Sequence, residues 1–302
     1  MPIQKEIWLK DIAEGFFPKN SFVSKSVNDD AFVDDGKKVH VPNAGAPSKV
    51  QKNRPSVPAT ASKRNDVDVE YTLDEFTTDP ICIPHADTVE LSYNKRQSVI
   101  SQDRQEIQKT AQESILASWA PGKDNCVLTT GAAVKAHQKD VTGNRKAVTT
   151  ADILELMTKF NEADIPEEGR YLLLDAKMYA QLLDAITDTD RIGFFQAADV
   201  ANGIVGKLYG FNVMQRSSVL RYDVSGSTVT GLASSDKATD CAAGLAWQEG
   251  CVRRALGDVK IFEDTDSPSY YGDVLSFLVR AGGTATYKDK RGVYALVGIT
   301  AA

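Results

Sequence analysis

The sequence predicts an α+β fold, and three patterns along the chain carry this expectation. Between residues 66 and 74, apolar side chains alternate with acidic or polar ones, which is typical of a strand with one dry face. From Ile100 to Trp119, apolar residues recur along one side of a long and otherwise polar helix. Residues 149–186 then follow the order helix, strand, helix, which indicates a modest α/β sandwich within the chain.

Composition limits the class of protein. The chain has 302 residues, enough for one large domain or two ordinary ones, and 25% of them are charged and 42% hydrophobic. No apolar run approaches the roughly 20 residues that span a bilayer, so we expect no membrane partner. The N-terminus lacks the apolar core of a signal peptide, which predicts folding in the cytosol. A net charge of −6 argues against tight, non-specific binding of nucleic acid over the whole surface.

The usual motifs of catalytic chemistry do not occur in the sequence. The four cysteines form no CxxC pair and the three histidines stand beside no triad or zinc motif, so we expect reduced thiols. Residues 203–208 resemble the end of a phosphate-binding loop. However, Ala201 stands where the first glycine of such a loop is required, and Leu208 stands where a Ser or Thr would hold magnesium. The acidic run at 188–199 has Ile192 where a calcium ligand is needed. We therefore predict no enzyme activity, no cofactor, and no catalytic, cofactor-binding or metal-ligating residue; an enzyme whose site is built from unmarked residues is the alternative.

The first 34 residues carry apolar and aromatic side chains with little regular pattern. Residues 5–16 are compatible with a short helix that ends near Gly15 and Pro18. An arm of this kind needs a surface to cover its aromatic side chains. That surface is expected to be either the chain's own domain or a neighbouring subunit.

Residues 36–65 are basic and residues 66–90 are acidic, and neither stretch contains a charge of the opposite sign. One interpretation is a solvated, flexible loop beside an acidic surface strand. The other is a long two-stranded flap, with one strand near 38–41 and the other at 67–76. Because an isolated hairpin is marginal in water, we expect the flap to rest on a partner subunit, with its basic tip over an acidic patch.

The remaining elements follow from local signals. The long helix is expected to stop at Pro121 and Gly122, and Thr149 or Thr150 is expected to cap the next helix. Asp175 is expected to cap a second helix directly after a buried strand. The other expected elements are the buried strand 171–174, a connector at 123–148, tight turns around Gly206 and Gly210, an exposed loop at 221–240, and strands at 242–248, 258–262, 272–280 and 294–299.

Short motifs accompany this order of arm, flap, long helix, α/β part and final strands. They are Val89–Ser92 before the long helix, Gly169–Asp175, Gly206–Val213, Ala243–Trp247 and Gly272–Leu275. Over residues 30–300 their number and order resemble the major capsid protein of tailed bacteriophages. This is the Hong Kong phage capsid fold, which encapsulins share.

The resemblance implies a division of the chain into parts. These are an N-terminal arm at 1–34, an extended β-hairpin loop (the flap) at 35–85, a peripheral domain with a long spine helix at 86–146, an α/β axial domain at 147–257, and closing strands of the peripheral domain at 258–302. The loops at 187–203 and 221–240 are then the candidates for contacts around fivefold and sixfold axes.

The resemblance also implies a function. Such a protein self-assembles as hexamers and pentamers into an icosahedral shell that encloses a double-stranded DNA phage genome. The implied partners are other copies of the chain, a portal protein, a scaffolding protein, decoration proteins, and the packaged DNA, which is held non-specifically. The expected location is the virion capsid, assembled in the host bacterial cytoplasm. An encapsulin-type compartment is the alternative, and the long flap counts against it.

Two features of some family members are not expected here. No long helical segment precedes the arm, so we expect a separate scaffolding protein or none, and no N-terminal cleavage. Lysines of the flap are expected to be plain surface residues, because no residue identifies an acceptor for a covalent crosslink.

Charged residues of the flap are the candidates for contacts between subunits. They are Lys49, Lys52, Arg54, Lys63, Arg64, Asp68, Glu70 and Asp74. The most testable contact pairs Asp68 and Glu70 of one copy with Lys52 or Arg54 of another. Individual exposed ion pairs contribute only about 0–1 kcal/mol, so such pairs are expected to set register and salt dependence rather than bulk stability.

Overall fold

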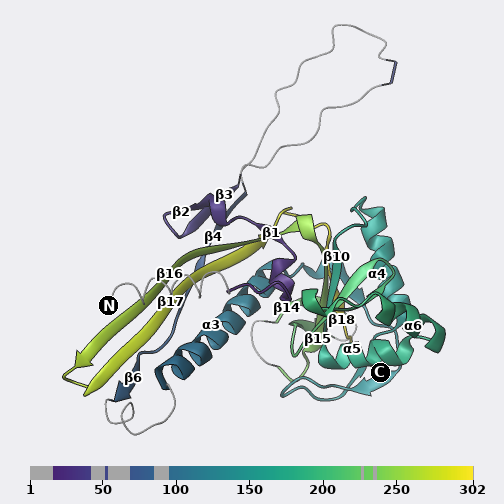
Figure 1. The fold of residues 1–302 in the computed structure, drawn as a ribbon. Coiled ribbons are helices and arrows are strands. Elements are labelled where there is room, and N and C mark those ends of the chain that lie inside the picture. Colours follow the sequence, from purple (N-terminus) through teal and green to yellow (C-terminus); the bar gives the residue numbers. More distant parts are fainter. Residues whose placement is uncertain are drawn as a thin grey trace.

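Two sheets organise the chain, one long and narrow and the other broad (Figure 1). The computed structural model describes residues 16–41, 52–53, 69–84, 95–225, 228–233 and 237–301. The long sheet has the order β1 (Val27–Asn28), β16 (Val252–Ser267), β17 (Gly272–Ala285) and β5 (Asp74–Thr77), and β6 (Ile81–Pro84) also pairs with β17. A smaller sheet joins β2 (Val33–Asp34), β3 (Lys38–Val41) and β4 (Val69–Thr72).

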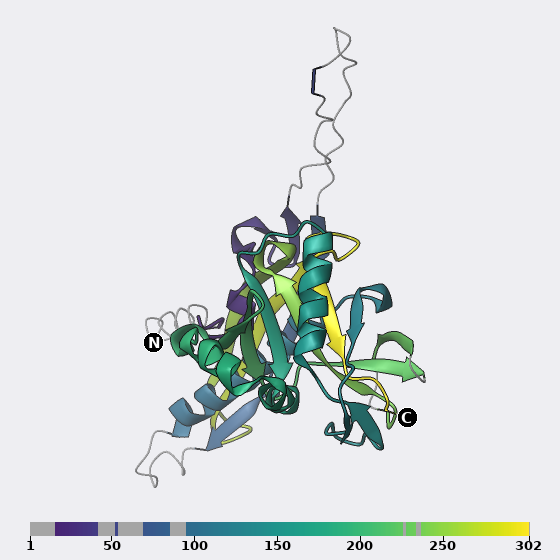
Figure 2. The same ribbon diagram turned by 90° about the vertical axis from the view of Figure 1, so that its right-hand side faces the viewer.

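The broad sheet forms the α/β part of the molecule. Its strand order is β11 (Ile204–Leu208), β12 (Phe211–Arg216), β10 (Arg170–Asp175), β15 (Cys241–Gln248), β13 (Leu220–Ser225) and β14 (Thr228–Leu232), while β18 (Val293–Val297) pairs with β15 and with β7 (Cys126–Leu128). Its helices are α4 (Thr150–Glu162), α5 (Ala176–Ala185) and α6 (Asp188–Gln196). In Figure 2 the teal helix α4 stands in front of the yellow strand β18, and the ring of Phe160 lies 5.0 Å from that of Tyr294.

Short elements connect these parts. They are the 3-10 turns η1 (Phe22–Ser24), η2 (Asp30–Phe32), η3 (Lys123–Asn125), η4 (Val200–Asn202) and η5 (Glu249–Cys251), and the strand pair β8 (Ala133–Lys135) and β9 (Asn144–Lys146).

Helix α3 (Lys95–Trp119) lies along the long sheet and packs against β17 (Figure 1). One stripe of the helix is buried: Ile107, Ala111, Ile115, Leu116 and Trp119. At Gly283 of β17 a Cβ would lie 2.9 Å from Trp119 Nε1 and 3.0 Å from Ile115 Cγ2, so only glycine allows this close approach. The predicted long helix with a narrow apolar stripe, resting on one flat surface and ending before Pro121, is confirmed.

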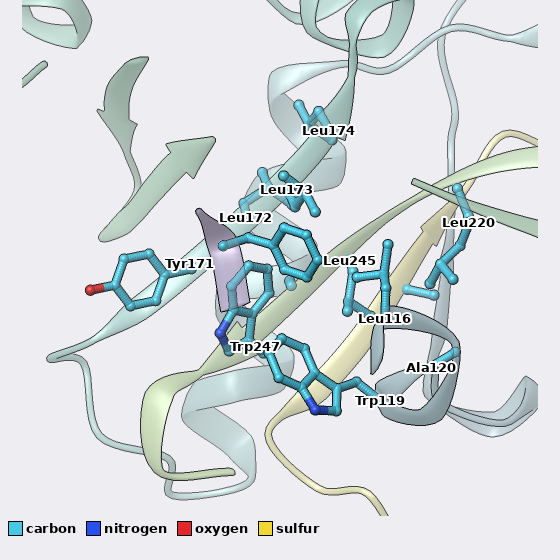
Figure 3. Packing of buried hydrophobic residues seen from close by; sticks show 14 of the residues in the cluster. Leu116, Trp119, Ala120, Tyr171, Leu172, Leu173, Leu174, Leu220, Leu245 and Trp247 are labelled. Atoms are coloured by element: carbon cyan, nitrogen blue, oxygen red, sulfur yellow. The ribbon is translucent and has the colours of Figure 1, made fainter. Parts of the chain in front are cut away.

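The core joins the two parts through the aromatic residues shown in Figure 3. Trp119 of α3 faces Trp247 of β15, with ring centroids 5.8 Å apart, and Trp247 stacks on Tyr171 of β10. Every residue of β10 is buried. The strand is internal to the sheet, between parallel β12 and antiparallel β15, and its side chains are covered by packing on the sheet faces, including helix α5. The predicted buried strand is therefore confirmed.

The predicted helix caps are also confirmed. The N–H of Thr149 donates to Asp152 Oδ2 at 2.8 Å, which closes a capping box at the start of α4. Asp175 Oδ1 accepts from the N–H groups of Lys177 and Met178, at 2.9 and 2.7 Å, at the start of α5.

The described part of the arm packs on the chain's own core. Phe22 is buried with its ring edge-on to Trp119 and Trp247, and Trp247 Nε1 donates to the carbonyl of Lys25 at 2.8 Å. Strand β1 then adds to β16 in parallel. For residues 16–28, the surface that covers the arm is therefore the chain's own domain, one of the two expected possibilities. The short helix expected at 5–16 lies almost wholly outside the described residues.

Three expected irregular segments contain regular structure. The exposed loop expected at 221–240 is largely the hairpin β13–β14, and Tyr222 is buried, with its hydroxyl donating to the carbonyl of Pro121 at 2.8 Å. The connector at 123–148 contains β7, β8 and β9. The loop expected at 187–203 contains α6 and η4. Propensity missed these elements because packing on the core overrides polar composition in short segments.

The turn expected around Gly206 is wrong, whereas the turn at Gly210 is confirmed. Gly206 lies within β11, and a Cβ there would come within 2.3 Å of the Phe194 ring. The glycine is therefore needed to make room for the Phe194 side chain, not to reverse the chain direction. Gly210 has a φ of +83°, which suits the tight turn between β11 and β12. Lys207, which follows Gly206, is an exposed strand residue.

Two of the final strands, β16 and β17, are longer than expected, whereas β18 is slightly shorter, and the three divide between the two sheets. Strand β16 begins at Val252 and crosses the expected boundary at 257, and β17 continues to Ala285. Strand β18 pairs with β15 in the broad sheet, and β7 joins the same sheet by pairing with β18. Both strands lie in segments that were expected to be peripheral. All five residues of β18 are buried, which fits its continuous run of mostly apolar side chains. Such a run predicts a buried strand but does not indicate which of the two sheets the strand joins.

Candidate assembly surfaces

The base of the flap is a short antiparallel ladder. Strand β3 pairs with β4 in the register Lys38 with Thr72 and His40 with Glu70. Val39, Val41 and Leu73 form a small core with Ala255 of β16. The two predicted strands of the flap are thus confirmed over 38–41 and 69–72.

The second flap strand does not continue as one element to residue 76. At Leu73 the ladder with β3 ends, and β5 pairs instead with β17, Asp74 lying opposite Ala281. The Leu73 side chain packs over Gly257 and Gly282, where any Cβ would meet its methyl groups at 2.8 and 3.0 Å. As the alternation in the sequence predicts, the Leu73 side chain is buried. The strand it belongs to, however, pairs with β3 of the small sheet before Leu73 and with β17 of the long sheet after it.

A buried ion pair holds the base of the flap to β16. The carboxylate of Asp29 accepts from Arg253 Nη1 at 2.8 Å and from the Tyr71 hydroxyl at 3.1 Å. The Asp29 side chain is 1% exposed and that of Arg253 is 16% exposed. The contact links Asp29, the residue before η2, with β4 and β16, which are far apart in the sequence, and fixes the position of the base of the flap on the long sheet.

Burial, followed by the negative charge of Asp29, raises the pKa of Tyr71, and burial raises the pKa of Tyr222. A raised pKa means that the folded state holds the phenol proton more tightly than the unfolded state. The stabilisation is therefore full below about pH 10, the unfolded value, and falls as the pH rises above it, by at most about 1.4 kcal/mol per pH unit and tyrosine. Urea unfolding at increasing alkaline pH should show this decline, and the Tyr71→Phe variant should show a shallower one. An equal slope in both proteins would contradict the assignment.

The predicted contact residues of the flap fall into two groups. Glu70 Oε1 lies 3.2 Å from His40 Nδ1 across the ladder, and both side chains are exposed. Asp74 Oδ2 accepts from Ser114 Oγ of α3 at 3.0 Å, and Lys52 is exposed in a turn with Asn53. The other predicted residues, Lys49, Arg54, Lys63, Arg64 and Asp68, lie outside the described residues. Contact of any of these residues with a second subunit stays a prediction.

An apolar patch on α6 and η4 was not singled out in the sequence. The exposed fractions of Ile192, Phe195 and Val200 are 64%, 46% and 81%. Phe194, the neighbour of Phe195, is buried against Gly206 and fixes the helix on the sheet. Figure 1 shows α6 at the opposite end of the molecule from the tip of β16 and β17. The N-cap residue Thr187 and the pair of phenylalanines were the local signals available for this short helix, although a loop was expected at 187–203.

A second exposed group lies at the tip of the β16–β17 hairpin. Tyr270 and Tyr271 are 59% and 81% exposed in the connecting turn, and Phe262 on β16 is 52% exposed. Large aromatic side chains exposed in this way are typical of protein contacts.

The described residues form no arrangement typical of catalysis. His137 Nε2 lies 2.8 Å from Asp175 Oδ2, but the other oxygen of Asp175 is committed to the cap of α5. All four cysteines are free, and burial raises the pKa of Cys126 and Cys251 to about 11. Among the described residues no cluster of three or more His, Cys, Asp or Glu side chains could hold a metal ion. None of the described helices has both the length and the apolar character needed to cross a membrane.

Comparison with known proteins identifies the fold. The sequence matches no family model, and no match was found among curated proteins. Solved structures do match. The capsid of Ralstonia phage GP4 superposes with a TM-score of 0.66 and 12% identity, covering 96% of this chain and 91% of that one.

Two further capsids agree with this result. The capsid of cyanophage P-SCSP1u gives a TM-score of 0.60 at 16% identity, covering 92% of this chain and 87% of that one. The capsid of a native GTA particle gives 0.59 at 11% identity, covering 94% and 91%. The chain therefore has the mixed α and β fold of phage capsid proteins, as the sequence resemblance predicted.

Proposed function

We propose that the chain is the major capsid protein of a tailed bacteriophage. Hexamers and pentamers of the chain would close into an icosahedral shell around double-stranded DNA. The observation that carries the proposal is the match of nearly the whole chain, 92–96% of it, to capsid structures of similar length. An enzyme or an isolated binding domain has no reason to share this full set of parts.

The exposed surfaces support the proposal independently. Closed shells require heterologous contacts, in which one patch of a subunit meets a different patch of the next. The chain offers separate surfaces for such contacts: the charged flap, the apolar patch of α6 and η4, and the aromatic tip of β16 and β17. We propose the long sheet with α3 as the peripheral domain and the broad sheet as the axial domain, which moves β7 and β18 from the expected peripheral segments to the axial one.

The partners follow from this role. Other copies of the chain are the main partner, and a portal protein, a scaffolding protein and decoration proteins complete a tailed-phage head. The net charge of −6 suits an inner wall that holds packed DNA without strong ionic contacts. The proposed location is the virion, after assembly in the bacterial cytoplasm.

Light scattering and negative-stain microscopy of the purified chain, over a series of salt concentrations, test the proposal. Closed shells or rings of subunits are the expected result, and their loss at high salt would implicate the charged flap because salt screens exposed charges. If the chain alone stays monomeric, co-expression with the neighbouring phage genes supplies a scaffold. Monomers under both conditions would contradict the proposal, and shells that package a protein cargo instead of DNA would favour an encapsulin.

The apolar patch of α6 and η4 is expected to be needed for ring contacts. Ile192→Glu combined with Val200→Asp should leave the unfolding free energy within about 0.5 kcal/mol of the wild type, because both side chains are exposed. Assembly should fail, since charged groups would have to be buried without partners. Leu154→Glu on α4, also at an exposed position, is the matched control and should still assemble. Normal shells from the double variant would exclude the patch as a contact.

A further inference from the structure

A small pocket of about 20 Å³ lies where the loop between β8 and β9 meets the start of β15. Gln138 and Arg145 line it from the β8–β9 hairpin, Gln181 lines it from α5, and Asp240 is the residue before β15. A buried water molecule needs a space on the order of 10–15 Å³. The pocket is therefore large enough for water, and it is far smaller than the roughly 300–1,000 Å³ of sites for organic ligands.

Three polar atoms of this lining are buried without a hydrogen-bond partner in the described part of the chain. They are Gln138 Oε1, Arg145 Nε and Asp240 Oδ1. Arg145 is 8% exposed and Asp240 is 0% exposed, so bulk solvent does not reach these two groups freely. A buried polar atom without a partner is unfavourable, and ordered water commonly satisfies such atoms inside folded proteins.

The other polar groups of the same three side chains are already engaged. Arg145 Nη1 donates to two backbone carbonyls of its own hairpin, at 3.1 and 3.2 Å, and Nη2 donates to the carbonyl of Asp240 at 3.0 Å. Asp240 Oδ2 accepts from the N–H of Lys237 at 3.0 Å. Gln138 Nε2 donates to the carbonyl of Leu220 at 3.4 Å, which orients the amide and leaves Oε1 as the acceptor still to be satisfied.

Two further polar side chains line the pocket, and both have partners elsewhere. His137 Nε2 lies 2.8 Å from Asp175 Oδ2. Gln181 Oε1 accepts from the N–H of Val148 at 3.1 Å. The unmet requirement of the pocket is therefore one acceptor for an N–H group and two donors for oxygen atoms.

We propose that this pocket binds an ordered water molecule, which accepts from Arg145 Nε and donates to Gln138 Oε1 and Asp240 Oδ1. Three hydrogen bonds are typical of a buried water. A cation would suit the two oxygen atoms but would lie beside the Arg145 guanidinium, and an anion would lie beside the Asp240 carboxylate. A small neutral ligand that both donates and accepts meets all three atoms. The proposal is independent of the proposed function, because a single copy of the chain contains the whole site.

The water joins two loops at one edge of the broad sheet. The N–H of Thr142 donates to the carbonyl of Ala238 at 3.2 Å, which links the loop of the β8–β9 hairpin to the loop before β15. The N–H of Ala136 donates to the carbonyl of Gly143 at 3.0 Å, which closes the hairpin loop itself. The water adds a bridge between the same two loops, so hydrogen exchange at the amides of Thr142 and Ala136 reports on its loss.

A structure of the full chain at a resolution that shows ordered water tests the site directly. The expected result is a density peak about 2.7–3.2 Å from Arg145 Nε, Gln138 Oε1 and Asp240 Oδ1. A pocket without such a peak, or one closed by direct bonds among the three side chains, would overturn the proposal. A peak within about 2.5 Å of oxygen atoms alone would indicate a metal cation and would overturn it as well.

Two substitutions of Gln138 separate the water from the side chain's own contacts. Gln138→Met removes the acceptor and the bond to Leu220, so the peak should disappear, and exchange at Thr142 and Ala136 should become about five- to tenfold faster. Gln138→Glu also loses the bond to Leu220 but keeps an oxygen acceptor, so the peak should remain and exchange should stay close to that of the wild type. Gln105→Met, at an exposed position on α3, is the matched control and should change neither result.

Two outcomes of the substitutions would contradict the proposal. A peak that persists unchanged in Gln138→Met would exclude Gln138 as a partner of the water. Equal acceleration of exchange in Gln138→Met and Gln138→Glu would assign the effect to the lost bond with Leu220. Neither outcome would affect the proposed function, which the assembly experiments test separately.

Discussion

Replacement of Trp247 by alanine is expected to lower the free energy of unfolding by about 3–5 kcal/mol. The side chain is fully buried and contacts three aromatic rings, those of Tyr171, Phe22 and Trp119. Alanine would leave a cavity where α3, the broad sheet and the arm meet (Figure 3). It would also leave the Lys25 carbonyl without its donor. Urea unfolding of the dissociated subunit, followed by far-ultraviolet circular dichroism, measures the loss.

Two variants control this experiment. Trp247→Phe keeps most of the ring and removes the hydrogen bond to Lys25, so a smaller loss of about 1–3 kcal/mol is expected. Tyr271→Ala removes a large side chain that is 81% exposed, and its effect should stay within about 0.5 kcal/mol. If Trp247→Ala cost no more than Tyr271→Ala, the aromatic cluster would not be the junction of the two parts.

Replacement of Asp29 by alanine is expected to cost about 3–5 kcal/mol, because it leaves the partly buried guanidinium of Arg253 without its carboxylate. The Tyr71 hydroxyl would lose its acceptor in the same step. Hydrogen exchange should locate the damage, with protection lost first in β3 and β4 at the base of the flap. Urea unfolding gives the total loss.

The double variant Asp29→Leu with Arg253→Met distinguishes a buried charge from a simple loss of contacts. Removal of both charges avoids the unpaired guanidinium, so the double variant should be more stable than Asp29→Ala alone. Asp34→Ala, an exposed acidic position five residues away, should change stability by less than about 0.5 kcal/mol. A double variant less stable than Asp29→Ala would show that the pair acts mainly through packing.

Much of the fold was accessible from the sequence where a signal is local. Thr149 and Asp175 cap helices through atoms two or three residues away, so side-chain type and spacing were sufficient. The stripe of α3 and the alternation at Leu73 repeat with the period of the element that contains them. The resemblance to phage capsids rested on the order of such local signals, and the comparison of structures confirms the fold.

The candidate surfaces were less accessible. Glu70 and Asp74 were identified as charged flap residues, but the sequence did not show that His40 and Ser114 are their partners within the chain. The patch of Ile192, Phe195 and Val200 was missed because exposed and buried apolar residues look alike in a short helix. The hollow between α3 and β5 that Asp79 and Asp103 line was missed because these two residues stand 24 positions apart in the sequence.

By itself the sequence determined the strand and helix periods, the helix caps, and the separation of basic and acidic charge along the flap. Tertiary structure alone decided that the strand broken at Leu73 serves two sheets, that β18 joins β15, and that Asp29 meets Arg253. Each of these depends on contacts between residues tens to hundreds of positions apart, as from Asp29 to Arg253. Such contacts are selected by the burial and pairing of the whole chain, and no local pattern of side chains records which partner a buried surface will meet.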